Sequence, residues 1–253
     1  MLTAPVEWSI RGALLRRPVL LWGLFLGTVT AMALVAKSLA PDLMSGPAGV
    51  GPLQVTLQVL MLLMVLPFAA RVGTARLGLV PVTSPRKLLV LLFPALTVAY
   101  GFSLGFREVP LETLVFALLS VALAGTVEEL AFRGVLLDSL APRGIWRAVA
   151  LSSALFGLMH VTNLFLGAPW FSVLLQVTFA GMAGTGYAAM RLRTRSLWPP
   201  IILHALFDLT FRVAVVQPGS LFANTIQMLH GVGWLIFALI VLRPSQRADI
   251  EAR

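Results

Sequence analysis

Long apolar runs, separated by short polar segments, fill almost the whole chain. Each has about 20 residues, the length that crosses a hydrocarbon layer of about 30 Å as a helix. The pattern predicts an all-α polytopic membrane protein with about eight transmembrane helices in one bundle, at approximately residues 18–36, 53–70, 88–106, 111–131, 148–166, 170–190, 197–216 and 221–242. We expect a single membrane domain over residues 1–253, which begins with a short interfacial segment at 1–17.

The composition supports this class. Hydrophobic residues make up 58% of the chain and charged residues 11%, and the mean hydropathy is +0.93. Soluble domains average about 45–50% apolar and about 25% charged residues, so the apolar surface of this chain requires lipid. Cysteine is absent, which excludes disulfides, thiolate metal sites and a cysteine nucleophile.

The net charge of +9 first suggests a nucleic-acid partner, but the distribution of the charges favours the bilayer. If the N-terminus is cytoplasmic, only Lys37, Arg107 and Arg212 of the 19 basic residues face the other side. This is the positive-inside pattern, and it predicts that both termini are cytoplasmic and that nucleic acid is not a partner. Arg far outnumbers Lys, which is typical of GC-rich bacterial genomes, so we expect the bacterial inner (plasma) membrane.

The stretch "TVEELAFRGVLL", residues 126–137, places charged side chains in an otherwise apolar run. A charge at the centre of a membrane helix costs roughly 2.5–3.5 kcal/mol, so these side chains should face inward and be paired. Glu129 and Arg133 are four residues apart and can meet on one helix face. Glu128 lies about 100° around the helix and stays free for chemistry. The alternative is that both acids only neutralise Arg133 at a helix end.

Two later apolar runs also carry polar pairs at helical spacing. "FGLMHVTN" places Phe156 and His160 one turn apart and Asn163 three residues further on, and "PPIILHALFDL" places His204 and Asp208 on one face. Residues four apart share a helix face. We therefore expect the three runs to bring their polar side chains together in the cytoplasmic half of the bundle, with His160 lying deepest.

These three motifs resemble those of a known family. "EELAFRG", "FGLMH" and "HALFD" are similar to the EExxxR, FxxxH and HxxxN/D motifs of the CAAX-protease and bacteriocin-processing (CPBP) family of intramembrane proteases, and they occur in the same order. The resemblance covers about the last 130 residues, whereas the N-terminal half is similar only in hydropathy. The number of predicted spans agrees with the type II CAAX prenyl endopeptidase branch.

The resemblance implies an intramembrane endopeptidase of the glutamic type, with residues 111–216 as its catalytic core. It implies that Glu128, assisted by His160, activates a water molecule, and that His204 and Asp208 polarise the scissile carbonyl. An ionised Asp208 cannot donate a hydrogen bond to an oxyanion, so orienting His204 is its alternative role. By the same resemblance Glu129 and Arg133 form a structural pair. We expect Phe156 and Asn163, from the second polar stretch, to support the site as well.

The resemblance implies no cofactor. Two His and several acids also suit zinc, so a metal-dependent enzyme stays open, although the chain has no HExxH motif. The expected partner besides lipid is a membrane-tethered peptide or protein, with its cleavage site near the cytoplasmic face. A proton-coupled transporter, in which buried Glu, Arg and His form a relay, is one alternative function. A catalytically silent immunity or scaffold relative is another.

Overall fold

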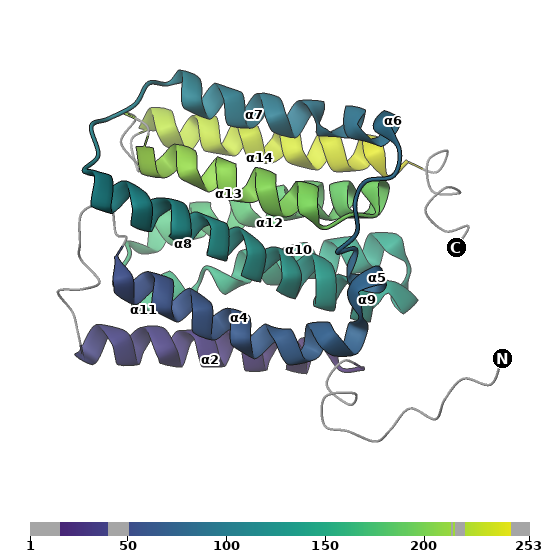
Figure 1. Cartoon of the computed structure of the whole chain (residues 1–253), viewed down its shortest axis with the longest axis horizontal. Helices are drawn as coiled ribbons and strands as arrows, with labels where there is room; N and C mark the ends of the chain where they lie inside the picture. The colour runs from purple at the N-terminus through teal and green to yellow at the C-terminus, as the bar shows by residue number, and fades with distance from the viewer. Residues whose placement is uncertain (1–15, 40–50, 214, 216–220, 244–253) are drawn as a thin grey trace.

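The computed structural model describes residues 16–39, 51–213, 215 and 221–243, which form a bundle of roughly parallel and antiparallel helices (Figure 1). The interfacial segment predicted at 1–17 lies outside these residues apart from its last two positions. The long helices are α2 (Pro18–Leu39), α4 (Pro52–Val72), α7 (Leu92–Ser103), α8 (Leu111–Glu129), α10 (Ile145–Met159), α12 (Trp170–Thr194), α13 (Trp198–Val213) and α14 (Leu221–Val241).

Short helical pieces extend several of these elements. They are α5 (Thr74–Leu77), α6 (Pro85–Leu88), the 3₁₀-helix η2 (Leu89–Leu91), the π-helix η3 (Leu130–Leu136), α9 (Leu137–Leu140), the 3₁₀-helix η4 (Ala141–Arg143) and α11 (Thr162–Phe165). With them, six helical segments of the described chain are long and apolar enough to cross a membrane. Helix α13 and the apolar part of α14, Gln227–Val241, are shorter. The all-α membrane class is confirmed, and a total of eight crossings stays a prediction.

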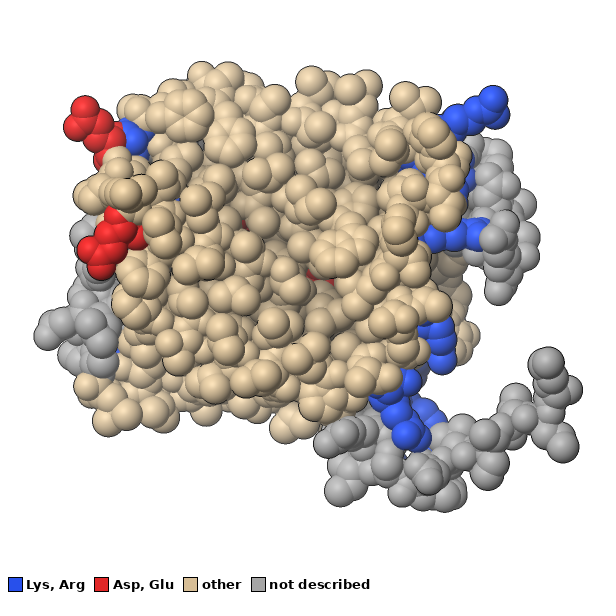
Figure 2. Space-filling view, viewed as in Figure 1, with Lys and Arg blue, Asp and Glu red and all other residues tan. Residues whose placement is uncertain are grey.

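Basic side chains gather at one end of the bundle. Figure 2 shows most of the visible Lys and Arg side chains at the end where α2 begins and α14 ends. The acidic side chains that project from this face lie at the opposite end. The last turns of α4, α6, η4 and α12 supply this basic end with Arg71, Arg86, Lys87, Arg143, Arg191 and Arg193. Because positively charged ends face the cytoplasm, this arrangement supports the predicted orientation of the helices.

Glycines allow the central helices to touch at their backbones. A Cβ on Gly157 of α10 would lie 2.5 Å from the carbonyl oxygen of Val177 and 3.0 Å from the amide nitrogen of Gly181, both in α12. A Cβ on Gly125 of α8 would lie 3.0 Å from the carbonyl oxygen of Ile201 in α13. Small residues at such crossings let membrane helices approach closely, which brings α10 against α12 and α8 against α13.

The loop after α5 holds the start of α13 in place. The Leu197 amide donates to the Gly78 carbonyl at 2.7 Å, and the Ser196 hydroxyl donates to the Val80 carbonyl at 2.6 Å. The Arg191 side chain donates to two carbonyls of α5 at 2.7 and 2.9 Å. Gly78 has φ = 78°, a left-handed conformation that favours glycine. These bonds fix the position of α13, the helix that carries His204.

We expect Gly157→Ala to destabilise the protein by about 1–3 kcal/mol, because its methyl group would meet the backbone of α12 and overpacking costs this much. The matched control is Gly27→Ala in α2. Its Cβ meets no atom within 4 Å, and replacing a helical Gly by Ala raises helix propensity. Thermal unfolding in a mild detergent measures both. Equal stability of Gly157→Ala and the unsubstituted protein would contradict the close α10–α12 crossing.

Candidate active site

A buried ion pair lies where α8 continues into the π-helix η3. Arg133 Nη1 donates to Glu129 Oε1 at 2.8 Å, and both side chains are fully buried. The guanidinium carbon of Arg133 lies 4.1 Å from the centre of the Phe156 ring, within the range of a cation–π contact. A Cβ on Gly184 would lie 2.9 Å from Arg133 Nη2, so this glycine provides the space for the guanidinium. π-Helical turns are frequent at functional sites.

His204 is bound to the same carboxylate. Its Nδ1 lies 2.8 Å from Glu129 Oε1, the oxygen that also accepts from Arg133. A carboxylate only accepts hydrogen bonds, so Nδ1 of His204 is the donor. This bond keeps a proton on Nδ1, and Nε2 lies on the other side of the ring. The sequence predicted the Glu129–Arg133 pair but not its bond to His204.

The free nitrogen of His204 faces two further acids. His204 Nε2 lies 3.7 Å from Glu128 Oε2 and 3.8 Å from Asp208 Oδ2. Both distances exceed the length of a direct hydrogen bond and suit a group that bridges the atoms. Of the two adjacent glutamates, one is thus paired with Arg133 and the other faces the imidazole, as the helical spacing predicted. Figure 2 shows acidic atoms near the middle of a face that otherwise carries no charged side chains, below the surrounding surface.

His160 lies at the C-terminal end of α10, next to Phe156. Its Nδ1 lies 3.1 Å from the Phe156 carbonyl oxygen. Because a carbonyl only accepts, Nδ1 donates and Nε2 of the neutral ring is free. The Phe156 ring meets both His160 and His204 edge-on, with centroids 5.3 and 5.9 Å apart. The three motif helices therefore converge around Phe156. No hydrogen bond or ion pair links His160 with Glu128 within the described chain, so their cooperation stays a prediction.

Asn163 lies beside this cluster, in α11. Its side-chain amide donates to Gln176 Oε1 in α12 at 2.8 Å. The backbone amide of Asn163 donates to the His160 carbonyl at 3.0 Å, which ties the start of α11 to the histidine. The structure therefore shows Asn163 linking α11 to α12, and a direct role in the site stays a prediction.

Two residues that contact the site were not predicted from the sequence. Tyr187 of α12 stacks on the His204 ring, and Gly184 makes room for Arg133. Tyr187 is one of two tyrosines in the chain, and its place one turn after Gly184 is the one signal that the sequence offers.

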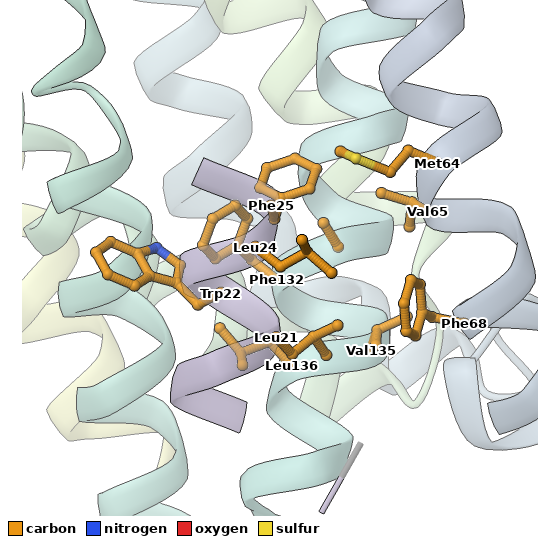
Figure 3. A pocket seen from close by; sticks show the side chains of 11 residues that line it. Leu21, Trp22, Leu24, Phe25, Met64, Val65, Phe68, Phe132, Val135 and Leu136 are labelled. Carbon is orange, nitrogen blue, oxygen red and sulfur yellow. The ribbon is translucent and has the colours of Figure 1, made fainter. Parts of the chain in front are cut away.

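An apolar groove lies between α2, α4 and η3, next to the site (Figure 3). Its lining is apolar except for the Trp22 indole nitrogen, which donates to the Leu155 carbonyl at 2.9 Å. Phe132 forms part of the wall and also contacts Phe156, with ring centroids 5.1 Å apart. The groove is therefore separated from Phe156 by the thickness of one aromatic side chain.

The side chains do not form an evident metal site. Among the residues that the structure describes, no group of three or more His, Asp or Glu side chains is arranged to hold a metal ion. Nδ1 of His204 is bound to Glu129 at 2.8 Å. Nε2 of His204 lies 3.7 Å from Glu128 Oε2 and 3.8 Å from Asp208 Oδ2.

Fold and site together define an all-α membrane protein with a buried cluster of acids, imidazoles and one arginine. The family model described as "Type II CAAX prenyl endopeptidase Rce1-like" matches residues 110–210. The match confirms the resemblance drawn from the three motifs, and the matched residues contain every predicted site residue. No curated protein sequence matches the chain.

We expect Glu129→Leu to destabilise the protein by about 3–5 kcal/mol, because it leaves the Arg133 charge buried without a partner. The double variant Glu129→Leu/Arg133→Met should recover most of this loss, since apolar replacement of a whole buried pair is often neutral. The control is Asp138→Ala, which removes an ion pair to Arg76, a side chain with 69% exposure, and should cost about 0–1 kcal/mol. Unfolding in detergent measures all three, and similar losses for Glu129→Leu and Asp138→Ala would argue against the buried pair.

Proposed function

We propose that the chain is an intramembrane endopeptidase of the glutamic type, which hydrolyses a peptide bond of a membrane-associated substrate near the cytoplasmic face. The family match supports a CAAX-type protease in general. The geometry of His204 carries the finer proposal. Its Nδ1 is held by the buried Glu129–Arg133 pair, and its Nε2 faces the two acids that remain.

In this mechanism Glu128 is the general base. Its carboxylate takes a proton from a water molecule, and the resulting hydroxide attacks the carbonyl carbon of the scissile bond. Glu128 then transfers the same proton to the leaving amine as the carbon–nitrogen bond breaks. A positioned general base typically contributes about 10²–10⁴-fold to the rate. The free Nε2 of His160 is the second group in the site able to orient the water, because its Nδ1 is engaged by the Phe156 carbonyl.

His204 is the group that stabilises the developing negative charge. When Nε2 carries a proton it donates to the carbonyl oxygen, and Glu129 holds the ring by Nδ1 so that little reorganisation is needed. Preorganised donors in a site sheltered from water are a major source of catalysis. An ionised Asp208 cannot donate, so we assign it to orienting the Nε2 side of His204, from which it lies 3.8 Å away.

The substrate in this proposal is a membrane-tethered peptide or protein. In support of a cytoplasmic location, His204 lies less than two turns from the start of α13, which follows the basic last turn of α12. A bacterial precursor peptide or the C-terminal tail of a membrane-anchored protein fits a bacterial inner membrane, which is the location we propose.

We expect Glu128→Gln to reduce cleavage at least about 100-fold, because glutamine cannot accept the proton of the attacking water. Wild type and variant are reconstituted in vesicles with a panel of membrane-tethered peptides, and mass spectrometry identifies the products. The control is Glu112→Gln, an exposed acid in the first turn of the same helix, which should cleave like wild type. Equal cleavage by Glu128→Gln and wild type would remove Glu128 from the mechanism.

We also expect cleavage to persist after dialysis against EDTA and 1,10-phenanthroline, since the proposed chemistry needs no metal ion. Metal content of the dialysed protein is measured by mass spectrometry alongside the rate. Loss of activity that returns on addition of zinc, and only then, would replace the glutamic mechanism by a metal-dependent one.

A further inference from the structure

The Tyr187 ring lies between His204 and Trp234. It is stacked on the imidazole, with centroids 4.9 Å apart and planes at 16°, and tilted against the indole, with centroids 4.9 Å apart. Tyr187 is 2% exposed, so neither lipid nor solvent supplies the contacts of its ring. A Cβ on Gly186 would collide with Trp234, and this glycine therefore lets the indole support the back of the tyrosine.

The same ring also contacts Arg133. The guanidinium carbon lies 5.4 Å from the centre of Tyr187 and 4.1 Å from that of Phe156. Within the described residues Arg133 is held by a single hydrogen bond from Nη1, and its Nε and Nη2 have no protein partner. Its position consequently depends on the two rings. Tyr187 thus contacts both groups that donate to Glu129 Oε1, the guanidinium and the imidazole.

Two constraints are needed to aim Nε2 of His204. The bond from Nδ1 to Glu129 fixes one edge of the ring but still permits small rotations about the side-chain bonds of His204. A stacked aromatic ring fixes the plane of the imidazole, because rotation would break the face-to-face contact. With both constraints Nε2 is directed at Glu128 and Asp208, at the distances observed.

We propose that Tyr187 is a positioning residue, whose ring fixes the plane of His204 and the location of the Arg133 guanidinium. Its effect on catalysis rests on the proposed peptidase function, whereas its effect on the histidine does not. The aromatic ring performs this role rather than the hydroxyl, because the contacts that join Tyr187 to His204 and Arg133 are made by the ring.

Three substitutions test separately what the ring, the volume and the hydroxyl group of Tyr187 contribute. Tyr187→Phe keeps the aromatic ring and removes the hydroxyl. Tyr187→Met keeps most of the side-chain volume but has no planar ring, and Tyr187→Leu has neither the ring nor the volume. The matched control is Tyr100→Leu, at the other tyrosine of the chain, which meets His230 edge-on with centroids 5.7 Å apart. Both tyrosines therefore touch a histidine, but Tyr100 belongs to α7 and the periphery of the bundle.

We expect Tyr187→Met and Tyr187→Leu to lower kcat roughly 10–100-fold, since small misplacement of a catalytic group has effects of this size. Their KM should change less than about twofold, because the substrate contacts are unaltered. Tyr187→Phe and Tyr100→Leu should keep kcat within about threefold of wild type. Full activity of the Met and Leu variants, or loss of activity in Tyr187→Phe, would overturn the proposal.

Nitrogen NMR of the histidine rings tests positioning without any substrate. The full-length protein is labelled at its three histidines, and His160→Gln and His230→Gln assign the signals. The Nδ1 of His204 should give the signal of a protonated nitrogen in wild type and in Tyr187→Phe, and a signal averaged between protonated and unprotonated forms in Tyr187→Met. The same single signal in all three would overturn the proposal. A changed signal in Tyr187→Met, when even wild type cleaves no peptide, would uphold the positioning role and count against the peptidase.

Discussion

The buried pair of Glu129 and Arg133 is the interaction on which the rest of the site depends. Neither charge is tolerated alone at membrane depth, because transfer of an isolated ion from water costs several kcal/mol even after relaxation. The pair therefore has to form, and its neighbours are arranged to permit it. Gly184 leaves room for the guanidinium, and the rings of Phe156 and Tyr187 lie against it. Once formed, the pair offers one fixed carboxylate oxygen, to which His204 is bound.

Helical geometry separates the two adjacent glutamates into different environments. Successive residues point about 100° apart, so the acid that faces Arg133 cannot share that partner equally with the acid before it. Glu129 is fully buried, whereas the Glu128 side chain is 17% exposed and faces the free nitrogen of His204. The two adjacent acids therefore differ: Glu129 is held in the buried ion pair, and Glu128 is left to face His204. Two carboxylates with distinct surroundings are a common way to divide catalytic roles.

Sequence alone predicted what depends on local spacing. Apolar runs located the helices to within a few residues, and i, i+4 geometry predicted the pairs of Glu129 with Arg133 and of His204 with Asp208. The bond between His204 and Glu129, the stacking of Tyr187 and the π-helix at Leu130–Leu136 could not be predicted in this way. The first two join residues of different helices, whose rotation and depth are set by packing. The third is a local change of helical period, and no pattern in the sequence of Leu130–Leu136 indicates it.

The position of each helix in the bundle explains why the motifs are confined to the second half of the chain. In α2 and α4 about 17% of the membrane-length stretch is buried, compared with 44% for Leu111–Arg143 and 56% for α12. A helix that mainly meets lipid needs little more than apolar side chains, and many sequences satisfy that requirement. The inner helices must instead provide glycines at backbone contacts, partners for buried charges and rings against the histidine. Residues 110–210, where the family match lies, are the part of the chain under these stricter demands.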